Sequence, residues 1–194
     1  NSKKPVWEKN IYAFILDWIS PASTIAVSTS GSTGPPKVLD LQKKFMIVSA
    51  LGTISDLDLS NQDTAWLCLP VHYIAGKMMI VRAIVGELNL VYTEPSNSPS
   101  LDDSMDPDFV AMVPNQVASL MESKKGTNIL ENINKVLIGG SIIHPSLEKQ
   151  IVDNNYITAW HSYGMTETIT HIALRKLGSH AHIGDFIPLK GVSI

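Results

Sequence analysis

The sequence predicts an α/β fold with largely parallel sheets flanked by helices. Short apolar runs, rich in β-branched residues, alternate with helix-type segments along the chain, which is typical of parallel strands joined by crossover helices. Several of these runs are followed by stretches rich in Gly, Ser or Thr. Apolar residues make up 44% of the 194 residues and charged residues 17%, so the chain can bury a substantial core.

The N-terminal half is predicted to begin with a helix. Apolar residues recur at helical spacing over 6–19, and Pro21 ends that helix. A stretch rich in Pro, Ser and Asp at 94–108 is expected to be an exposed, mobile loop that separates two sub-lobes, 1–95 and 105–194. The other elements expected here are strands at 24–27, 38–41, 65–69 and 88–92 and helices at 42–55 and 71–83.

The C-terminal half continues the alternation. Pro114 suits the first turn of a helix. Ligands of such sheets bind at the carboxyl ends of the strands, so the stretches that follow strands are the candidate sites. The elements expected here are strands at 109–113, 135–138, 157–160 and 192–194 and helices at 114–123, 145–154 and 167–177, with a Gly/His loop after the last helix.

Ten residues, 28–37, combine hydroxyl side chains, two glycines and a lysine directly after the first strand. Glycine lets a backbone approach its ligand closely, and backbone amides together with hydroxyls can donate several hydrogen bonds to one anion. Lys37 adds a positive charge. The pattern predicts a polyphosphate cradle formed by Thr29, Ser30, Gly31, Ser32, Thr33, Gly34 and Lys37.

This cradle differs from the Walker A loop. Its spacing is Gly31-x-x-Gly34-x-x-Lys37, and Val38 stands where the magnesium-binding hydroxyl of Walker A would be. A flexible Ser/Gly linker is the alternative interpretation. The two prolines and the new apolar run that follow argue against a linker.

Two further stretches follow predicted strands. Gly139-Gly140-Ser141 would let backbone groups approach a planar ring, although a plain strand-to-helix turn explains it equally well. In 163–167, Tyr163 could stack on a purine, Thr166 could bind a phosphate and Glu167 could hold Mg²⁺. Taken singly, the tyrosine could be a core residue and the glutamate could only complement a helix dipole.

In this order the three stretches resemble the adenylate-forming superfamily of acyl- and aryl-CoA synthetases, luciferases and peptide-synthetase adenylation domains. Residues 30–37 are similar to its phosphate loop, 163–167 to its Tyr-Gly-x-Thr-Glu motif, and 139–141 to its adenine-contacting turn. The resemblance extends from residue 24 to residue 194. It implies that the chain is part of the large N-terminal domain of such an enzyme.

The resemblance also implies a two-step reaction with ATP, Mg²⁺ and coenzyme A. The carboxylate of a small acid attacks the α-phosphorus of ATP, and the thiol of coenzyme A then attacks the acyl-adenylate. Lys37, Thr166 and Glu167 would be the catalytic residues, with Glu167 as the metal ligand. The implied contacts to ATP or AMP are Thr29, Ser30, Gly31, Ser32, Thr33, Gly34, Lys37, Gly139, Gly140, Ser141, His161, Tyr163, Gly164, Met165 and Thr166.

A Leu-Pro segment at 69–82 stands where the superfamily lines its acyl pocket. It resembles the 2-succinylbenzoate–CoA ligases of menaquinone biosynthesis, although the usual pocket histidine aligns with Tyr73 and His72 falls one place early. A substrate with two carboxylates would favour a nearby cation. The candidate substrate contacts are His72, Tyr73, Gly76, Lys77 and Arg82.

Two features of the superfamily are missing from the sequence: an aspartate that holds the ribose hydroxyls, and a mobile C-terminal lid domain with a catalytic lysine. We therefore expect 1–194 to be an incomplete N-terminal AMP-binding domain that lacks the lid. Two other hypotheses stay open: an adenylating enzyme for another carboxylic acid, and a nucleotide- or acyl-binding module without turnover. An α/β-hydrolase is disfavoured because no Gly-x-Ser-x-Gly elbow occurs.

Composition narrows the classes of partner that the chain is expected to bind. The net charge of −3 provides no electrostatic footprint for nucleic acid, and no apolar run has the length of a membrane span. Cys68 lies in an apolar run, which indicates a buried thiol and fits a reducing cytoplasm. His180 and His182 lack further ligands nearby, so they are expected in a solvated loop. The sequence does not predict an oligomeric state.

Overall fold

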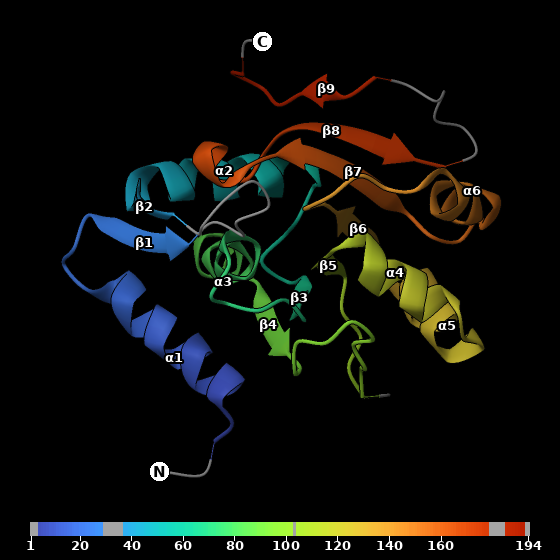
Figure 1. The fold of residues 1–194 in the computed structure, drawn as a ribbon, viewed down its shortest axis with the longest axis horizontal. Helices are drawn as coiled ribbons and strands as arrows, with labels where there is room; N and C mark the ends of the chain where they lie inside the picture. The colour runs from blue at the N-terminus through green and yellow to red at the C-terminus, as the bar shows by residue number, and fades with distance from the viewer. Residues whose placement is uncertain (1–3, 29–36, 103, 179–184, 193–194) are drawn as a thin grey trace.

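The computed structural model describes residues 4–28, 37–102, 104–178 and 185–192. Its centre is a seven-stranded sheet with the order β4-β3-β5-β6-β7-β8-β9 (Figure 1). The pairs from β4 to β7 are parallel, whereas β8 and β9 pair antiparallel. The strands are β3 (Thr64–Leu67), β4 (Asn89–Tyr92), β5 (Phe109–Met112), β6 (Lys135–Ile138), β7 (Ala159–Gly164), β8 (His171–Leu177) and β9 (Ile187–Pro188).

Helices cover both faces of this sheet. Side chains of α1, α2 and α3 pack in one hydrophobic cluster, and those of α4, α5 and α6 pack in a second cluster. Figure 1 shows α4, α5 and α6 grouped together, away from α1. The helices are α1 (Val6–Ile19), α2 (Lys43–Asp56), α3 (Ile74–Gly86), α4 (Pro114–Met121), α5 (Lys124–Asn132) and α6 (Pro145–Asp153), with a short 3₁₀ helix, η1 (Thr166–Thr168).

The central strands are buried on both faces, which explains their continuous apolar sequences. Leu67, Phe109 and Leu137 face the cluster with α1–α3, and their neighbours Trp66 and Val110 face the cluster with α4–α6. Cys68 is buried beside β5, as its apolar surroundings in the sequence indicated, and burial raises the pKa of its thiol to about 12. The alternation of strands and helices thus gives the predicted α/β fold.

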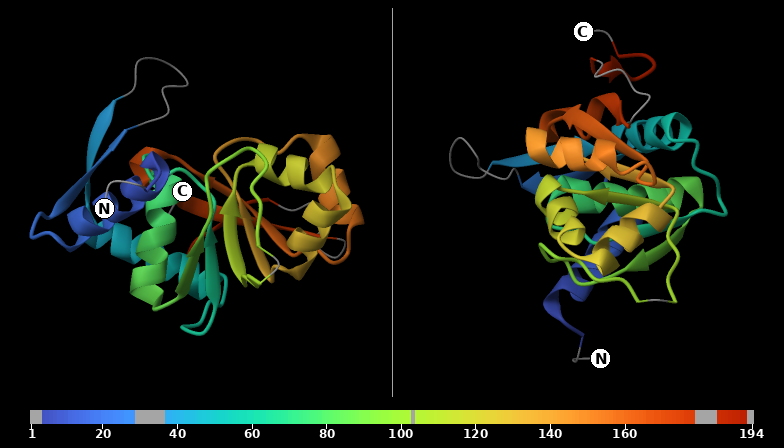
Figure 2. Two further views of the ribbon diagram at one scale, coloured as in Figure 1. Left: turned by 90° about the horizontal axis from the view of Figure 1, so that it is seen from below. Right: turned by 90° about the vertical axis from the view of Figure 1, so that its right-hand side faces the viewer.

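Two strands stand apart from the main sheet. β1 (Thr24–Ser28) and β2 (Val38–Gln42) pair antiparallel, with Thr24 opposite Gln42 and Ser28 opposite Val38. They form a narrow arm that extends away from the seven-stranded sheet (Figure 2). The strand before the predicted cradle and the strand after it are therefore each other's partners.

The helix expected at 167–177 is wrong. Only η1 forms at its start, and the rest is β8, which pairs with β7 from Ala159↔Leu177 to Gly164↔His171. Leu, Arg and Lys at 174–177 favour a helix, but β8 completes an otherwise open edge of β7. The strand expected at 157–160 begins later and extends to Gly164, because β8 pairs along its whole length.

Other boundaries differ less. The helix expected from residue 71 begins at Ile74, after a turn at Pro70. Helix α5 was not predicted. Its Gly126 lies so close to the Leu120 carbonyl that a Cβ atom would come within 3.0 Å, so α4 and α5 can form a tight corner. Val192 lies outside any strand, and the rest of the strand expected at 192–194 is outside the described residues.

The stretch at 94–108 is a loop, as expected. This loop is anchored to the rest of the fold, because Leu101 is buried in the cluster with α4–α6 and Gln116 Nε2 donates a hydrogen bond to the Ser96 carbonyl (2.9 Å). The strands on its two sides, β4 and β5, both lie beside β3. No helix in the described part of the chain is both long enough and apolar enough to cross a membrane.

Candidate functional site

The turn at Gly139-Gly140-Ser141 lies at the carboxyl end of β6, next to the parallel strand β7. The Gly139 amide donates to the Met112 carbonyl (3.0 Å), so the turn is anchored to β5 as well. A Cβ atom on Gly139 would come within 3.0 Å of Ser162 Oγ, and Gly140 has φ +85°. The positive φ of Gly140 favours glycine there, and a side chain at Gly139 would displace the Ser162 hydroxyl.

His161 contacts this turn directly. It is buried in β7, and its Nε2 lies 3.4 Å from the Ser141 carbonyl oxygen. On the other side of the ring, Nδ1 lies 3.3 Å from Nη2 of Arg175. Burial and the Arg175 charge hold the pKa of His161 below its ordinary value, although the Ser141 and Glu148 interactions oppose that shift. The imidazole is therefore neutral at neutral pH.

The Tyr-Gly-x-Thr-Glu stretch forms the end of β7 and the 3₁₀ turn after it. The Tyr163 ring is half exposed, 5.7 Å from the ring of Phe186. The Met165 amide donates to Thr168 Oγ1 (3.0 Å), which shapes the turn that presents Thr166 and the exposed Glu167. Gly164 passes so close to the Thr170 backbone that a side chain would not fit there.

Of the residues predicted to form the polyphosphate cradle, the structure describes Lys37. Thr29, Ser30, Gly31, Ser32, Thr33 and Gly34 lie outside the described residues. Lys37 is exposed and immediately precedes β2 on the two-stranded arm. The structure therefore brings the turn at 139–141 together with His161. Of the predicted cradle it describes Lys37, together with the flanking strands β1 and β2.

The Leu-Pro segment turns from β3 into α3. His72 and Tyr73 are exposed, with ring centroids 4.0 Å apart. Gly76 lies against the Pro70 carbonyl, where a Cβ atom would come within 3.0 Å. Lys77 reaches toward α1, with its Nζ 4.6 Å from the centre of the Phe14 ring, and burial lowers the pKa of its ammonium.

Arg82 points into the interior instead. Its side chain is buried, its Nε has no hydrogen-bond partner among the described residues, and its Nη1 lies 3.9 Å from the Met79 sulfur. Burial lowers the pKa of the guanidinium to about 10. No ion pair involves Arg82 among the residues that the structure describes. Lys77 and Arg82, the two cations of α3, therefore lie in different surroundings: Lys77 contacts α1, and Arg82 is buried in the interior.

His171, at the start of β8, accompanies Arg82. Its Nε2 is also buried without a hydrogen-bond partner. Burial, and secondarily the charge of Arg82, lower the pKa of its imidazole to about 3. A buried cation and a buried neutral imidazole that each have an unpartnered nitrogen can bind an anion, since each would then gain a missing partner.

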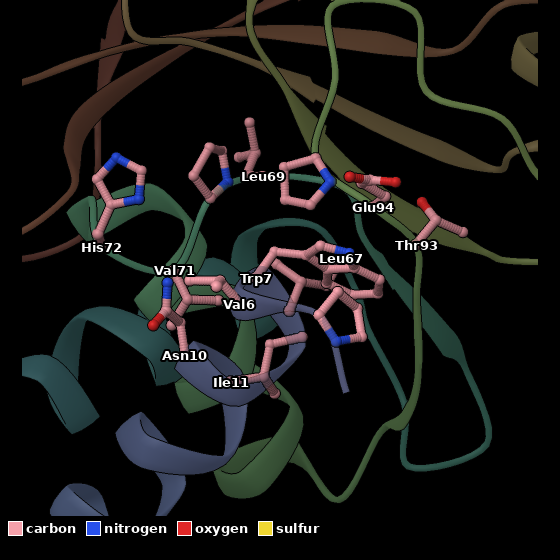
Figure 3. A pocket seen from close by; sticks show the side chains of 13 residues that line it. Val6, Trp7, Asn10, Ile11, Leu67, Leu69, Val71, His72, Thr93 and Glu94 are labelled. Carbon is pink, nitrogen blue, oxygen red and sulfur yellow. The ribbon is translucent and has the colours of Figure 1, made fainter. Parts of the chain in front are cut away.

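A cavity of about 460 Å³ lies between α1 and the carboxyl ends of β3 and β4. Figure 3 shows Trp7 and Ile11 on its helix side, and His72 and Glu94 on its strand side. Of the predicted substrate residues, His72 alone lines it among those that the structure describes. Arg82 is therefore not part of this cavity.

Within the described ranges, no three His, Cys, Asp or Glu side chains gather at one place. His180 and His182 are outside those ranges. The exposed carboxylate of Glu167 fits a Mg²⁺ ion that takes its other ligands from phosphate oxygens and water.

Sequence reasoning missed four residues of this region: Glu148, His171, Arg175 and Phe186. His171 and Arg175 lie in the segment where a helix was expected, and Phe186 lies in the segment after it, so their positions beside β7 were not assigned. The β-branched run Ile169-Thr170-His171-Ile172 was the available signal for a strand. Glu148 lies in the first turn of α6, where an acidic residue is ordinarily explained by the helix dipole.

Comparison with known proteins agrees with this arrangement. The model of the AMP-binding enzyme family matches residues 18–194. The 2-succinylbenzoate–CoA ligase of Staphylococcus aureus (strain MSSA476) is 28% identical over 144 residues, which is 72% of this chain. The chain spans 28% of the length of that relative.

Solved structures give the same picture. The acyl-CoA synthetase (AMP-forming)/AMP-acid ligase II-like protein of Dyadobacter fermentans superposes with a TM-score of 0.90 at 35% identity, over 98% of this chain and 55% of that one. O-succinylbenzoate coenzyme A synthetase (MenE) of Bacillus subtilis, in complex with ATP and magnesium ion, shares the fold. Its TM-score is 0.65 at 23% identity, over 78% of this chain and 32% of that one. The family match over most of the sequence, on a parallel sheet with the expected strand-end turns, shows that this chain belongs to the AMP-binding enzyme family.

Proposed function

We propose that this chain forms the nucleotide- and acid-binding part of an ATP-dependent acid–CoA ligase that activates 2-succinylbenzoate. The relatives named 2-succinylbenzoate–CoA ligase support the choice of acid. The observation that carries the proposal is that Arg82 and His171 are both buried with unpartnered nitrogens, and that the Arg82 charge acts on the His171 imidazole. This acid has a second carboxylate besides the one that reacts, and that group would provide the missing partner.

The energetics favour a bound anion at this place. A buried charge without a partner is strongly unfavourable, and hydrogen bonds to charged groups contribute about 1.5–3 kcal/mol. The second carboxylate of the acid would accept from Arg82 and from the protonated nitrogen of His171. In this role Arg82 selects for a di-acid, while Lys77 stabilises the contact between α3 and α1.

The residues at the strand ends would bind the nucleotide. The turn at 139–141 would present backbone groups to the adenine edge, and the half-exposed Tyr163 ring would stack on its face. Residues 29–34 and Lys37 would bind the β- and γ-phosphates, and Thr166 would bind the α-phosphate. Glu167 would hold Mg²⁺, which neutralises phosphate charge when bound.

The chemical step then depends on positioning and charge neutralisation. A carboxylate oxygen of the acid attacks the α-phosphorus, and pyrophosphate leaves. In the second half-reaction, the thiol of coenzyme A attacks the carbonyl carbon of the acyl-adenylate, and AMP leaves. The residues of this chain that act in the first half are Lys37, Thr166 and Glu167.

The acid is tested by calorimetry with non-hydrolysable acyl-adenylate mimics. We expect the succinylbenzoyl mimic to bind more tightly than fatty-acyl and aminoacyl mimics, and more tightly than its own methyl ester, which lacks the free carboxylate. Arg82→Met should weaken the free-acid mimic about 10- to 100-fold, the range for a hydrogen bond to a charge. It should leave AMP and the methyl ester unchanged. Equal binding of all mimics, no tighter than AMP, would remove 2-succinylbenzoate as the substrate.

The phosphate contacts are tested separately. Lys37→Ala should weaken ATP far more than AMP, because AMP lacks the β- and γ-phosphates. Lys44→Ala, which removes another lysine from the start of α2, is the matched control and should affect neither ligand. An equal loss of affinity for ATP and AMP in Lys37→Ala would contradict the assigned role.

A further inference from the structure

A partly buried ion pair lies on the side of His161 away from the turn. Arg175 of β8 donates from Nη1 to Glu148 Oε1 (2.8 Å) and from Nη2 to Glu148 Oε2 (2.7 Å). The two side chains are 16% and 23% exposed, so water screens the pair only partly. Nη2 of Arg175 also lies 3.3 Å from Nδ1 of His161.

The geometry dictates which nitrogen of His161 carries the proton. A guanidinium can only donate, so the Nδ1 atom facing Arg175 must accept and stays unprotonated. The proton of the neutral ring then resides on Nε2. That nitrogen faces the Ser141 carbonyl oxygen at 3.4 Å and donates to it. Were the proton on Nδ1, that N–H would face the Arg175 donor, and the lone pair of Nε2 would face the Ser141 carbonyl oxygen.

We propose that Arg175, which is held by Glu148, is a positioning residue of the nucleotide site: it sets the Nε2–H tautomer of His161, which holds the Ser141 carbonyl and shapes the turn at 139–141 for the adenine. Residues of α6, β7 and β8, which all follow the turn in the chain, thereby act on it. This inference rests on the proposed function in assigning the adenine to that turn.

The surroundings preserve this arrangement. Phe186 packs edge-on against the His161 ring, with centroids 5.0 Å apart, and lies 5.6 Å from the guanidinium carbon of Arg175. The charged groups that act on the imidazole are Arg175 from β8 and Glu148 from α6. Arg175 opposes protonation and Glu148 favours it, so removing Arg175 reverses the electrostatic balance at Nδ1.

The tautomer is tested by NMR of the protein labelled with ¹⁵N-histidine. The wild-type His161 should show a protonated Nε2 and an unprotonated Nδ1 from pH 6 to 8. Arg175→Met should shift the ring toward the Nδ1–H tautomer at pH 8, since Glu148 can then accept from Nδ1, and toward the doubly protonated form near pH 6. A wild-type ring with its proton on Nδ1, or an unchanged tautomer in Arg175→Met, would overturn the proposal.

Nucleotide affinity tests the consequence. AMP binding to Arg175→Met should be about two- to tenfold weaker at pH 8, the effect of losing one ordinary hydrogen bond. Affinity should recover toward pH 6, because the doubly protonated ring again carries Nε2–H. Glu148→Gln keeps Arg175 as the donor to Nδ1, so its AMP affinity should stay within twofold of wild type at both pH values.

Lys135→Met is the matched control. Lys135 of β6 pairs with Asp63 (3.1 Å), and its pair is similarly buried at 20% and 17% exposed, but it lies at the amino end of its strand. Its removal should change AMP affinity at neither pH. A uniform loss in Arg175→Met with no recovery in acid, or the same loss in Glu148→Gln, would mean that the ion pair only stabilises the fold and would overturn the positioning role.

Failure of the proposed function gives a different result. If the wild type does not bind AMP, the assignment of the turn to adenine fails, and with it the nucleotide part of this proposal. The NMR experiment would still decide whether Arg175 sets the tautomer of His161.

Discussion

At the scale of single residues, the buried histidines respond most strongly to pH. His171 has a pKa of about 3 in the folded chain, well below the ordinary value of 6.5, because burial and the nearby Arg82 disfavour its charged form. His161 is shifted in the same direction, first by burial. Both imidazoles regain ordinary behaviour when the chain unfolds, so folding is linked to proton release below pH 6.5.

The first prediction concerns this linkage. Between pH 6.5 and about 3 the unfolded chain binds more protons at His171 than the folded chain, so the free energy of unfolding falls as the pH falls. The slope from one such group is at most about 1.4 kcal/mol per pH unit. His171→Gln should reduce this slope, measured by urea unfolding between pH 6.5 and 4.5. His72→Gln, at an exposed histidine, should not change it.

Equal slopes in wild type and His171→Gln would contradict the lowered pKa of His171. The same variant tests the acid site, since glutamine offers a donor but no imidazole. For both His171→Gln and Arg82→Met, urea unfolding measures the role of the residue in stability. Binding of the acyl-adenylate mimics measures its role in binding the acid.

At the scale of elements, glycines decide how helices meet the sheet. Gly76 lies in the first turn of α3, and a Cβ atom there would press against the Pro70 carbonyl and come within 3.0 Å of that backbone. A backbone carbonyl cannot move aside as a flexible side chain can. Gly52, in α2, has no other atom within 4 Å of an added Cβ.

The second prediction contrasts these two glycines. Gly76→Ala should lower the free energy of unfolding by about 1–3 kcal/mol, the usual effect of overpacking. Gly52→Ala should raise it by about 0.5–1 kcal/mol, because alanine restricts the unfolded chain and favours a helix. Urea denaturation midpoints measure both. Similar changes of one sign in the two variants would show that backbone crowding at Pro70 is not the cause.

The type of element could be predicted from the sequence for most segments. The prediction failed where a tertiary partner decides whether a segment becomes a helix or a strand. The strands at 24–27, 38–41 and 135–138 are apolar and β-branched, and their local preference agrees with their place in the fold. The segment 171–177 has mixed preference. It becomes β8 because β7 would otherwise expose unpaired backbone groups along its edge.

At the scale of the whole molecule, one sheet joins the two hydrophobic clusters. Leu137 and Ile138 are neighbours on β6 and are both buried, but Leu137 faces the cluster with α1–α3 and Ile138 faces the cluster with α4–α6. Because β6 contributes to both clusters, neither cluster can lose its strand without disturbing the other.

The third prediction is that both clusters unfold in a single transition. Leu137→Ala and Ile138→Ala should each lower the free energy of unfolding by about 2–5 kcal/mol, the range for removing a large buried side chain. In each variant, tryptophan fluorescence and far-ultraviolet circular dichroism should report the same midpoint. Two separate midpoints would instead indicate that the sub-lobes 1–95 and 105–194, which the loop at 94–108 was expected to separate, unfold independently.

The sequence by itself determined the fold class and the identity of the strand-end turns. Local chemistry suffices for these: helical periodicity at 6–19, β-branched runs, and glycines where the backbone must turn, as at Gly140 with its positive φ. Only the tertiary structure decided which polar groups are buried together. The Arg82 charge acts on His171, and Arg175 contacts Glu148 and His161, because strand pairing and packing between elements bring these groups together. Which buried polar groups lack a partner depends on how the elements pack in the folded interior, and no pattern of neighbouring residues in the sequence reports it.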